Sequence, residues 1–175
     1  MQKAINKPIL LVGDSCTDKF VYCKCKRLCP EAPVPVLDII KTKTNKGMAG
    51  NVLKNLEALN CETHLLTNKN YKSIIKTRYV DYKTNHMFIR IDTKTQLKST
   101  FKDYCSNLNF DNYSAIVISD YNKGFITEEE IQHIGNNHPI TFLDTKKILG
   151  TWASSIKFIK INRKEYKESE HILTN

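Results

Sequence analysis

Charged and amide side chains follow several short apolar runs of this sequence, and their types suit the binding of a hydroxyl-rich or anionic small molecule. These polar positions are Asp14 and Asp18, Asn51, Asp120, Asp144 to Lys146, and Asn162 to Glu165. Carboxylates accept hydrogen bonds from hydroxyl groups, and charge-assisted hydrogen bonds are stronger than neutral ones. In open α/β sheets ligands bind outside the carboxyl ends of the strands, so the pattern predicts one shared ligand crevice.

Each of these positions also has a purely local explanation. Asp and Asn are favoured at helix N-caps and in turns, because their side chains hydrogen-bond nearby backbone groups. The recurrence of five such clusters in one chain favours a ligand site over five unrelated turns.

The cysteines offer a second kind of chemistry. Cys23, Cys25 and Cys29 form a C-x-C-x₃-C cluster that has the residue types of a zinc site, with Cys16 or a histidine as a fourth ligand. Structural zinc sites use paired halves with short spacings, and no second half is evident here. We therefore expect free thiols and no metal.

The elements that must position the polar clusters alternate between strand and helix patterns. Apolar runs predict strands at 9–12, 63–67, 115–119, 140–143 and 156–161, and helical spacing predicts helices after 51, at 97–108, after 127 and after 162. Prolines at 30, 33 and 35 force an extended path into an edge strand at 34–40, and 74–82 with 86–92 predict a β-hairpin. This order predicts a mainly parallel α/β sheet covered on both faces, with an antiparallel flap inserted.

The composition is that of one soluble globular domain over residues 1–175, with 41% hydrophobic and 26% charged residues. The apolar run at 9–12 is too short for a membrane span or a signal peptide, so we expect a cytoplasmic protein with reduced thiols. The net charge of +9 favours an anionic partner. The lysines are spread along the chain without a dense basic block, which makes nucleic acid the less favoured partner.

The polar clusters, taken in order, resemble the ribokinase-like (PfkB-type) carbohydrate kinases, and among them the heptose-7-phosphate kinases most. The matching strings are Ile9 to Asp14 with Asp18, Cys29 to Val36, Gly47 to Val52, Lys76 to Tyr79, Arg90 to Thr93, Ser119 to Gly124, Asp144 to Lys146, and Asn162 to Glu165. The most specific is Pro-Glu-Ala-Pro-Val-Pro-Val at 30–36. Because the order is kept from about Pro8 to the C-terminal region, chance similarity does not explain the match.

This resemblance implies a ribokinase-like fold with a small antiparallel flap, or lid, whose strands lie around 20–45 and 74–93. It implies ATP-dependent phosphorylation of a sugar phosphate, with ATP and Mg²⁺ as cofactors, and a homodimer formed through the flap. The substrate-binding residues that it implies are Asp14, Asp18, Gly47, Asn51, Arg90, Asp120 and Lys146. Arg90 and Lys146 are its candidates for the sugar's phosphate. Asn162 and Glu165 match an Asn-x-x-Glu element that helps to place magnesium and the nucleotide phosphates.

The sequence also departs from the family pattern. Gly47-Met48 stands where the family has two adjacent glycines, and an αβ segment of the family is missing between Asn68 and Lys76. No Gly-Ala-Gly-Asp-type motif follows Glu165, and no P-loop replaces it. In the family that motif supplies the anion-stabilising backbone N–H groups and the catalytic base. We therefore expect a truncated domain that lacks the C-terminal nucleotide-binding part and is inactive alone.

Three functions are compatible with these observations. The first is a sugar-kinase subunit or fragment that works only when another chain supplies the nucleotide half. The second is a non-catalytic sugar-phosphate-binding or regulatory module, and the third is a basic α/β protein that binds nucleic acid. The resemblance favours the first. A homodimer through the flap, or a complex with a chain that completes the sheet, is expected because an unpaired sheet edge usually finds a partner.

Overall fold

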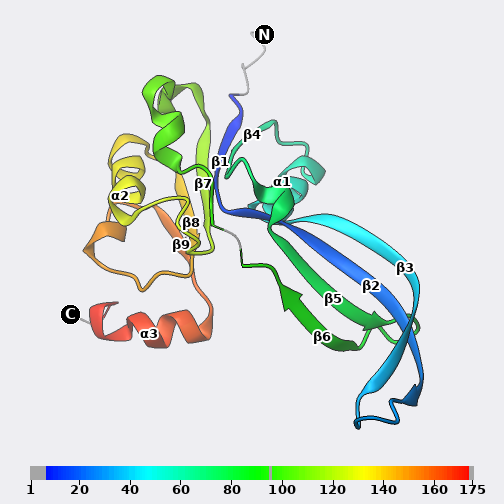
Figure 1. Cartoon of the computed structure of the whole chain (residues 1–175). Coiled ribbons are helices and arrows are strands. Elements are labelled where there is room, and N and C mark those ends of the chain that lie inside the picture. The colour runs from blue at the N-terminus through cyan, green and yellow to red at the C-terminus, as the bar shows by residue number, and fades with distance from the viewer. Residues whose placement is uncertain (1–6, 95, 174–175) are drawn as a thin grey trace.

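The computed structural model describes residues 7–94 and 96–173, which form two sheets (Figure 1). The larger sheet has five strands in the order β4-β1-β7-β8-β9, and all four pairings are parallel. Its strands are β1 (Ile9–Gly13), β4 (Thr63–Leu66), β7 (Ala115–Asp120), β8 (Thr141–Thr145) and β9 (Phe158–Lys160). The predicted mainly parallel α/β sheet is therefore confirmed.

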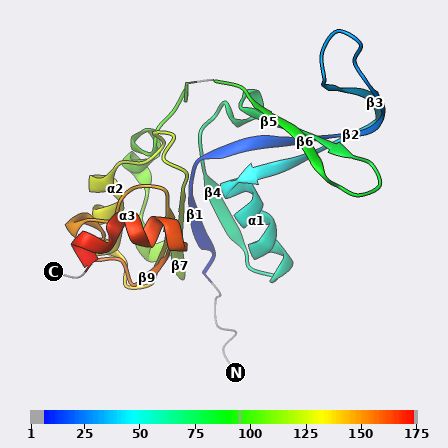
Figure 2. The same cartoon turned by 90° about the horizontal axis from the view of Figure 1, so that it is seen from below.

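Helices lie on both faces of this parallel sheet (Figure 2). Helix α1 (Ala49–Ala58) lies on one face, and helices α2 (Glu128–Asn137) and α3 (Arg163–Leu173) lie on the other. Successive side chains of a strand point to opposite faces. Leu10 and Val12 therefore pack with Ile131 and Ile134 of α2 in the main core, whereas Leu11, which is also fully buried, belongs to the opposite face. Of the described helices, none is long and apolar enough to cross a membrane.

The start of α2 follows the capping pattern that the sequence predicts. The Thr127 hydroxyl accepts a hydrogen bond from the Glu130 backbone N–H at 3.2 Å, and the Glu130 carboxylate accepts one from the Thr127 backbone N–H at 2.8 Å. Two backbone donors that the helix cannot pair are thereby satisfied.

The segment predicted as a helix at 97–108 differs in type. Only 101–107 is helical, as the 3₁₀ helix η2 (Phe101–Asn107), which begins at a capping box of Thr100 with Asp103. Phe101 is fully buried, and its backbone N–H donates to the Phe125 carbonyl at 2.7 Å. The apolar spacing indicated the correct buried face. The backbone hydrogen bond from Phe101 to Phe125 and the short length of the segment favour a 3₁₀ helix over an α-helix. The other 3₁₀ helices are η1 (Tyr71–Ser73), η3 (Phe110–Asn112) and η4 (Thr151–Ala153).

The second sheet, here called the flap, has four strands in the order β3-β2-β5-β6. They are β2 (Ser15–Leu28), β3 (Pro35–Met48), β5 (Ile75–Asp81) and β6 (Met87–Asp92). The pairs β2/β3 and β5/β6 are antiparallel as predicted, whereas β2 and β5 are parallel. Both of these strands leave the junction with the larger sheet, where the Thr17 N–H donates to the Ile74 carbonyl, and run outward in the same direction.

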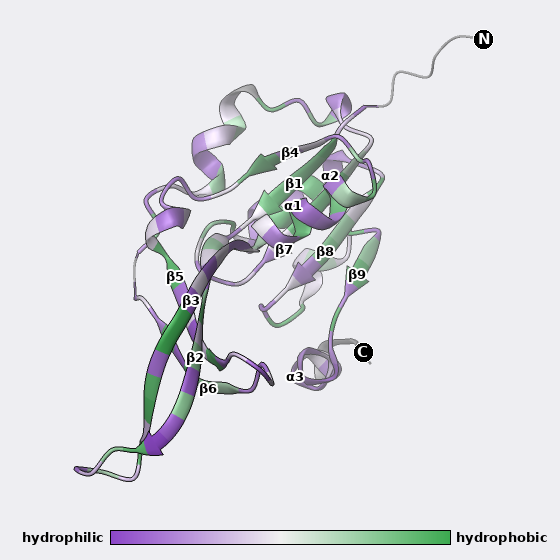
Figure 3. Ribbon diagram, turned by 90° about the vertical axis from the view of Figure 1, so that its right-hand side faces the viewer, coloured by the Kyte–Doolittle hydropathy of each residue, from purple (hydrophilic) through white to green (hydrophobic). Residues whose placement is uncertain are grey.

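The flap extends away from the parallel sheet as a long arm (Figure 3). Strand β3 lies at its edge, as the prolines before it predict. Several apolar side chains of β3 and β6 are exposed on the arm: Ile39, Ile40, Met87, Ile89 and Ile91. A thin sheet cannot bury both of its faces by itself.

Candidate functional site

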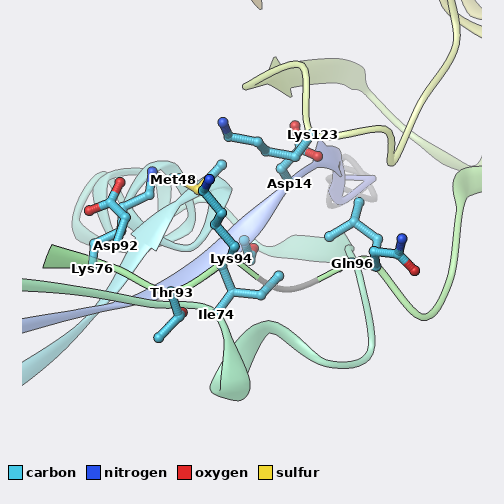
Figure 4. Close-up of a pocket in the computed structure, with 11 residues that line it drawn as sticks. Asp14, Met48, Ile74, Lys76, Asp92, Thr93, Lys94, Gln96 and Lys123 are labelled. Atoms are coloured by element: carbon cyan, nitrogen blue, oxygen red, sulfur yellow. The ribbon is translucent and has the colours of Figure 1, made fainter.

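A cavity of about 460 Å³ lies where the parallel sheet meets the flap (Figure 4). This junction cavity is lined by Asp14, Ser15, Met48, Ile74, Lys76, Asp92, Thr93, Lys94, Gln96, Leu97 and Lys123. The residues come from the junction of β1 with β2, the end of β3, the start of β5 with the residue before it, the end of β6, and the loops after β6 and β7. The cavity therefore lies outside the carboxyl ends of β1 and β7, where α/β sheets bind ligands, and its size is within the range of about 300–1,000 Å³ that is typical of ligand sites.

Asp14 is the buried carboxylate of the junction cavity, with 1% of its surface exposed. Its Oδ2 accepts a hydrogen bond from the Tyr121 backbone N–H at 2.7 Å. Its Oδ1 is buried and has no hydrogen-bond partner among the described residues, and the same holds for the hydroxyl of Ser15. A buried polar atom without a partner costs about 1–3 kcal/mol, so these two oxygens are suited to hydroxyl groups of a ligand.

The surroundings of Asp14 raise its pKa above the ordinary value of an aspartate. Burial raises the pKa of Asp14, and the nearby Asp120 raises it further, whereas backbone N–H groups of Tyr121, Lys123 and Phe125 lower it. Ion pairs within 7–94 and 96–173 use other carboxylates. The carboxylate is thus oriented by backbone dipoles, and no ion pair in this part of the chain competes with a ligand for its second oxygen.

Met48 forms part of the cavity wall with an unusual backbone. It is buried, with 6% of its surface exposed, and its φ is 58° with ψ −129° at the junction of β3 and α1. Glycine adopts this conformation easily, whereas other residues pay about 1–3 kcal/mol in strain. The second glycine of the family pattern is explained by this backbone, and Met48 adds a thioether to the wall.

Replacing Met48 by glycine should leave the protein more stable than replacing it by alanine, by about 1 kcal/mol or more, because both changes remove the thioether and only glycine relieves the positive φ. Urea unfolding of the two variants measures the difference. Lys54, an exposed position of α1, is the control. There the alanine variant should be more stable than the glycine variant by about 1 kcal/mol. Alanine equal to or better than glycine at 48 would show that the backbone there is unstrained.

Asp18 and Gly47 lie together at the base of the flap, outside the set of residues that line the junction cavity. Asp18 Oδ1 accepts a hydrogen bond from Arg78 Nη1 at 2.5 Å, and this ion pair is about four-fifths buried, with side-chain exposures of 21% and 22%. A Cβ at Gly47 would collide with the carboxylate of Asp18 and the thiol of Cys16. Gly47 is therefore needed for this close packing, and direct ligand contact by either residue stays a prediction.

Two other predicted residues also lie outside the cavity lining. Asn51 is exposed in the first turn of α1, and Arg90 is exposed on β6. Arg90 is held by Asp92 in a bidentate pair, with Nε 2.7 Å from Oδ1 and Nη2 2.6 Å from Oδ2. A phosphate contact by Arg90 stays a prediction, and it requires the guanidinium to leave or share this partner.

Asp120 is buried in a closed polar network beside Asp14. Its Oδ2 accepts hydrogen bonds from Thr145 Oγ1 at 2.6 Å and from Lys147 Nζ at 2.7 Å, and its Oδ1 accepts one from the Asn122 backbone N–H at 2.8 Å. Lys147 Nζ also donates to the Ile126 carbonyl at 3.0 Å. This network fixes the loop after β7, so the structure gives Asp120 a positioning role, and its contact with substrate stays a prediction.

The Asn-x-x-Glu element is engaged within the chain at the start of α3. Glu165 Oε1 accepts hydrogen bonds from Lys146 Nζ and, at 2.6 Å, from Asn162 Nδ2, while Oε2 accepts the Asn162 backbone N–H at 2.8 Å. Burial acts to raise the pKa of Glu165, but these hydrogen bonds and the Lys146 charge lower it below its ordinary value. Both carboxylate oxygens thus accept hydrogen bonds within the chain, and a role of Asn162 and Glu165 in placing Mg²⁺ stays a prediction.

The cysteines are free thiols: Cys16, Cys23, Cys25, Cys29, Cys61 and Cys105. Within residues 7–94 and 96–173, no three His, Cys, Asp or Glu side chains are grouped so that they could hold a metal ion.

Of the predicted binding residues, only Asp14 lines the junction cavity; Asp18, Gly47, Asn51, Arg90, Asp120 and Lys146 do not. Sequence reasoning missed Ser15 and the lysines at 76, 94 and 123, which also line it. Lys76 and Lys123 belong to the strings at 76–79 and 119–124 that resemble the kinase family, so their position in those strings was a usable signal. Lys94 carried no signal, since it follows the matched string at 90–93.

Known proteins resemble this chain in sequence and in fold. No family model matches the chain. The bifunctional protein HldE of Helicobacter pylori strain J99 is 29% identical over 201 residues, which cover 95% of this chain and 43% of the relative. The matched span is longer than the 175 residues of the chain, so the relative contains residues that this chain lacks.

Two solved structures show the same fold. Ribokinase from Thermotoga maritima matches with a TM-score of 0.53 at 12% identity. The match covers 95% of this chain and 64% of the ribokinase chain. Phosphofructokinase-2 from Escherichia coli in complex with fructose-6-phosphate has a TM-score of 0.52 at 12% identity, with coverages of 96% and 65%. The chain thus spans less than half of the curated relative and slightly under two thirds of the solved kinases.

Proposed function

We propose that this chain, which has the fold and the ordered sequence motifs of the ribokinase-like (PfkB-type) carbohydrate kinases, binds a sugar phosphate in its junction cavity as a relative of heptose-7-phosphate kinase. The observation that carries the proposal is the buried Asp14 carboxylate, whose Oδ1 has no partner among the described residues, in a cavity of ligand size. The similarity to HldE and to a phosphofructokinase solved with fructose-6-phosphate supports a sugar ligand.

In the reaction that this family performs, a sugar hydroxyl attacks the terminal phosphoryl group of ATP. The part proposed for this chain is to bind and orient the sugar, with Asp14 and Ser15 accepting or exchanging hydrogen bonds with its hydroxyl groups. The 175 residues contain no Gly-Ala-Gly-Asp-type motif to stabilise the transferring group. Phosphoryl transfer is therefore proposed only where further residues, of the same protein or of another polypeptide, supply this motif, and ATP and Mg²⁺ belong to that combination.

A non-catalytic sugar-phosphate-binding or regulatory role uses the same cavity. The observation behind this second candidate is that Glu165, which the resemblance assigns to magnesium, accepts hydrogen bonds from Lys146 and Asn162 within the chain. Measurement of phosphoryl transfer, with and without a second polypeptide, separates the two functions.

We also propose that the chain forms a homodimer through the flap. The support is the group of exposed apolar side chains on β3 and β6, among which Ile39 is 64% exposed and Ile89 and Ile91 are each 51% exposed. Burial of apolar area is favourable by about 25 cal/mol per Å², so a second flap that covers this face would stabilise both. A two-fold axis would bring the same residues of two copies together.

Asp14→Asn should weaken binding of D-glycero-D-manno-heptose 7-phosphate by roughly tenfold to a hundredfold, because losing one charge-assisted hydrogen bond costs about 1.5–3 kcal/mol. Calorimetric titration measures the dissociation constant. Asp38→Asn, at an exposed position of β3, removes the same charge and should leave binding unchanged. Equal affinities of wild type and Asp14→Asn, or no binding of the sugar by the wild type, would contradict the proposal.

A further inference from the structure

Three lysines from separate segments line the junction cavity: Lys76 of β5, Lys94 after β6 and Lys123 after β7 (Figure 4). The ion pairs of the described residues involve other basic side chains, so none of the three is paired with a carboxylate there. Asp92, which also lines the cavity, has both of its oxygens engaged by Arg90. The hydrogen bonds from Arg90 lower the pKa of Asp92, and the Lys76 charge helps to lower it, but the Lys76 ammonium group forms no ion pair with that carboxylate. The three lysines are therefore available to bind an anion.

Cations that line one cavity repel one another, and a bound anion reduces this repulsion. Lysine is a common phosphate ligand because its ammonium group is a compact charge with three donors. One of the three is also oriented: Lys76 Nζ lies 5.5 Å from the centroid of the Tyr121 ring, a cation–π contact that holds the side chain at the cavity.

The two residues that the sequence indicates for phosphate are in a different situation. Arg90 is paired with Asp92, and Lys146 is paired with Glu165 and lies 3.6 Å from Asp144. Either residue must give up a carboxylate before it binds a phosphate oxygen. The three cavity lysines form no ion pair among the described residues, and they lie in the same cavity as Asp14.

We infer that Lys76, Lys94 and Lys123 form a phosphate subsite of the junction cavity. A sugar monophosphate then binds with its phosphate at the lysines and its hydroxyl groups at Asp14 and Ser15. This inference rests on the proposed function, and it assigns residues that select the phosphorylated over the unphosphorylated sugar.

The test compares two triple variants that remove the same charge. Lys76→Gln/Lys94→Gln/Lys123→Gln changes the cavity, and Lys54→Gln/Lys83→Gln/Lys102→Gln changes three exposed lysines outside its lining. The probes are D-glycero-D-manno-heptose 7-phosphate, the unphosphorylated heptose and inorganic phosphate. Calorimetry gives the dissociation constant of the sugar phosphate, and saturation-transfer NMR follows the weaker ligands. Circular dichroism and thermal melts of both variants confirm that they are folded.

We expect the cavity variant to bind the sugar phosphate about a hundredfold more weakly and the unphosphorylated heptose within about threefold of wild type. The control variant should bind both ligands as wild type does, and inorganic phosphate should compete with the sugar phosphate only when the three cavity lysines are present. An equal loss in both triple variants would show general electrostatic attraction and overturn the subsite.

The two proposals fail in different ways. If the wild type binds the unphosphorylated heptose as tightly as its phosphate, or if the cavity variant keeps full affinity for the phosphate, the phosphate subsite is wrong while sugar binding at Asp14 stands. If the wild type binds neither sugar, the proposed function is wrong and the subsite falls with it.

Discussion

A polypeptide of residues 1–175 is expected to bind the sugar phosphate and to transfer no measurable phosphoryl group to it from ATP. Phosphoryl transfer depends on a base within hydrogen-bond reach of the attacking hydroxyl and on donors that stabilise the developing charge. Loss of the base alone typically lowers the rate by about 10²–10⁴-fold, and loss of one oxyanion donor by about 10²–10³-fold. No motif that supplies these groups occurs in the 175 residues.

Two carboxylates could replace the missing base, and both are already engaged within the chain. Asp120 is held by Lys147 and Thr145, and Asp144 is held by Lys160 at 2.9 Å with Lys146 at 3.6 Å. These contacts hold both carboxylates within the chain, so neither is free to face a sugar hydroxyl without first losing a partner.

Single-turnover reactions with radiolabelled ATP and Mg²⁺ measure the transfer, with the chain alone and with the product of a neighbouring gene. Transfer that appears only in the mixture shows that the second polypeptide supplies the missing groups, and no transfer in either shows that residues 1–175 with this partner bind the sugar without phosphorylating it. Clear product from the chain alone would contradict the prediction, and Asp120→Asn and Asp144→Asn would then show which carboxylate acts as the base.

The second large effect is expected on the oligomeric state. The wild type should elute as a dimer, twice the 20.2 kDa mass of one chain, at micromolar concentration. Ile89→Lys/Ile91→Lys should be a monomer, because it places charges on the exposed apolar face of β6 and, in a two-fold interface, brings like charges together. Size exclusion with light scattering measures the mass, and we expect the dimer dissociation constant to rise by more than about a hundredfold.

The matched control is Ile140→Lys/Ile148→Lys. These residues are 43% and 54% exposed and lie beside the parallel sheet rather than on the flap, so this variant should remain a dimer. A monomeric wild type that persists on concentration would contradict dimerisation altogether.

A second apolar surface gives the main competing interface. On β8 and β9 the rings of Phe142 and Phe158 stack with centroids 4.7 Å apart, and they are 40% and 49% exposed. A dimer that survives the flap changes and is lost on Phe142→Lys would place the interface on this face of the parallel sheet. The proposal of a flap dimer would then be wrong.

Local sequence patterns by themselves determine much of this fold. The strands of the parallel sheet follow from short apolar runs, and the start of α2 follows from Thr127 and Glu130, because such signals depend on residues close together in the chain. The place of Asp14 at the cavity follows for a similar reason, since it comes directly after β1 and the carboxyl ends of parallel strands meet at one edge.

Tertiary structure decides which polar residues share a site. Arg90 and Lys146 have suitable charges, yet each is in an ion pair with a carboxylate. Lys76, Lys94 and Lys123 line one cavity from three segments and form no ion pair among the described residues. Ion pairs of this kind join side chains whose distance and burial are set by strand register and packing. The composition of a sequence shows how many charges are present, but the strength of each interaction depends on separation and surrounding solvent, which exist only once the chain is folded.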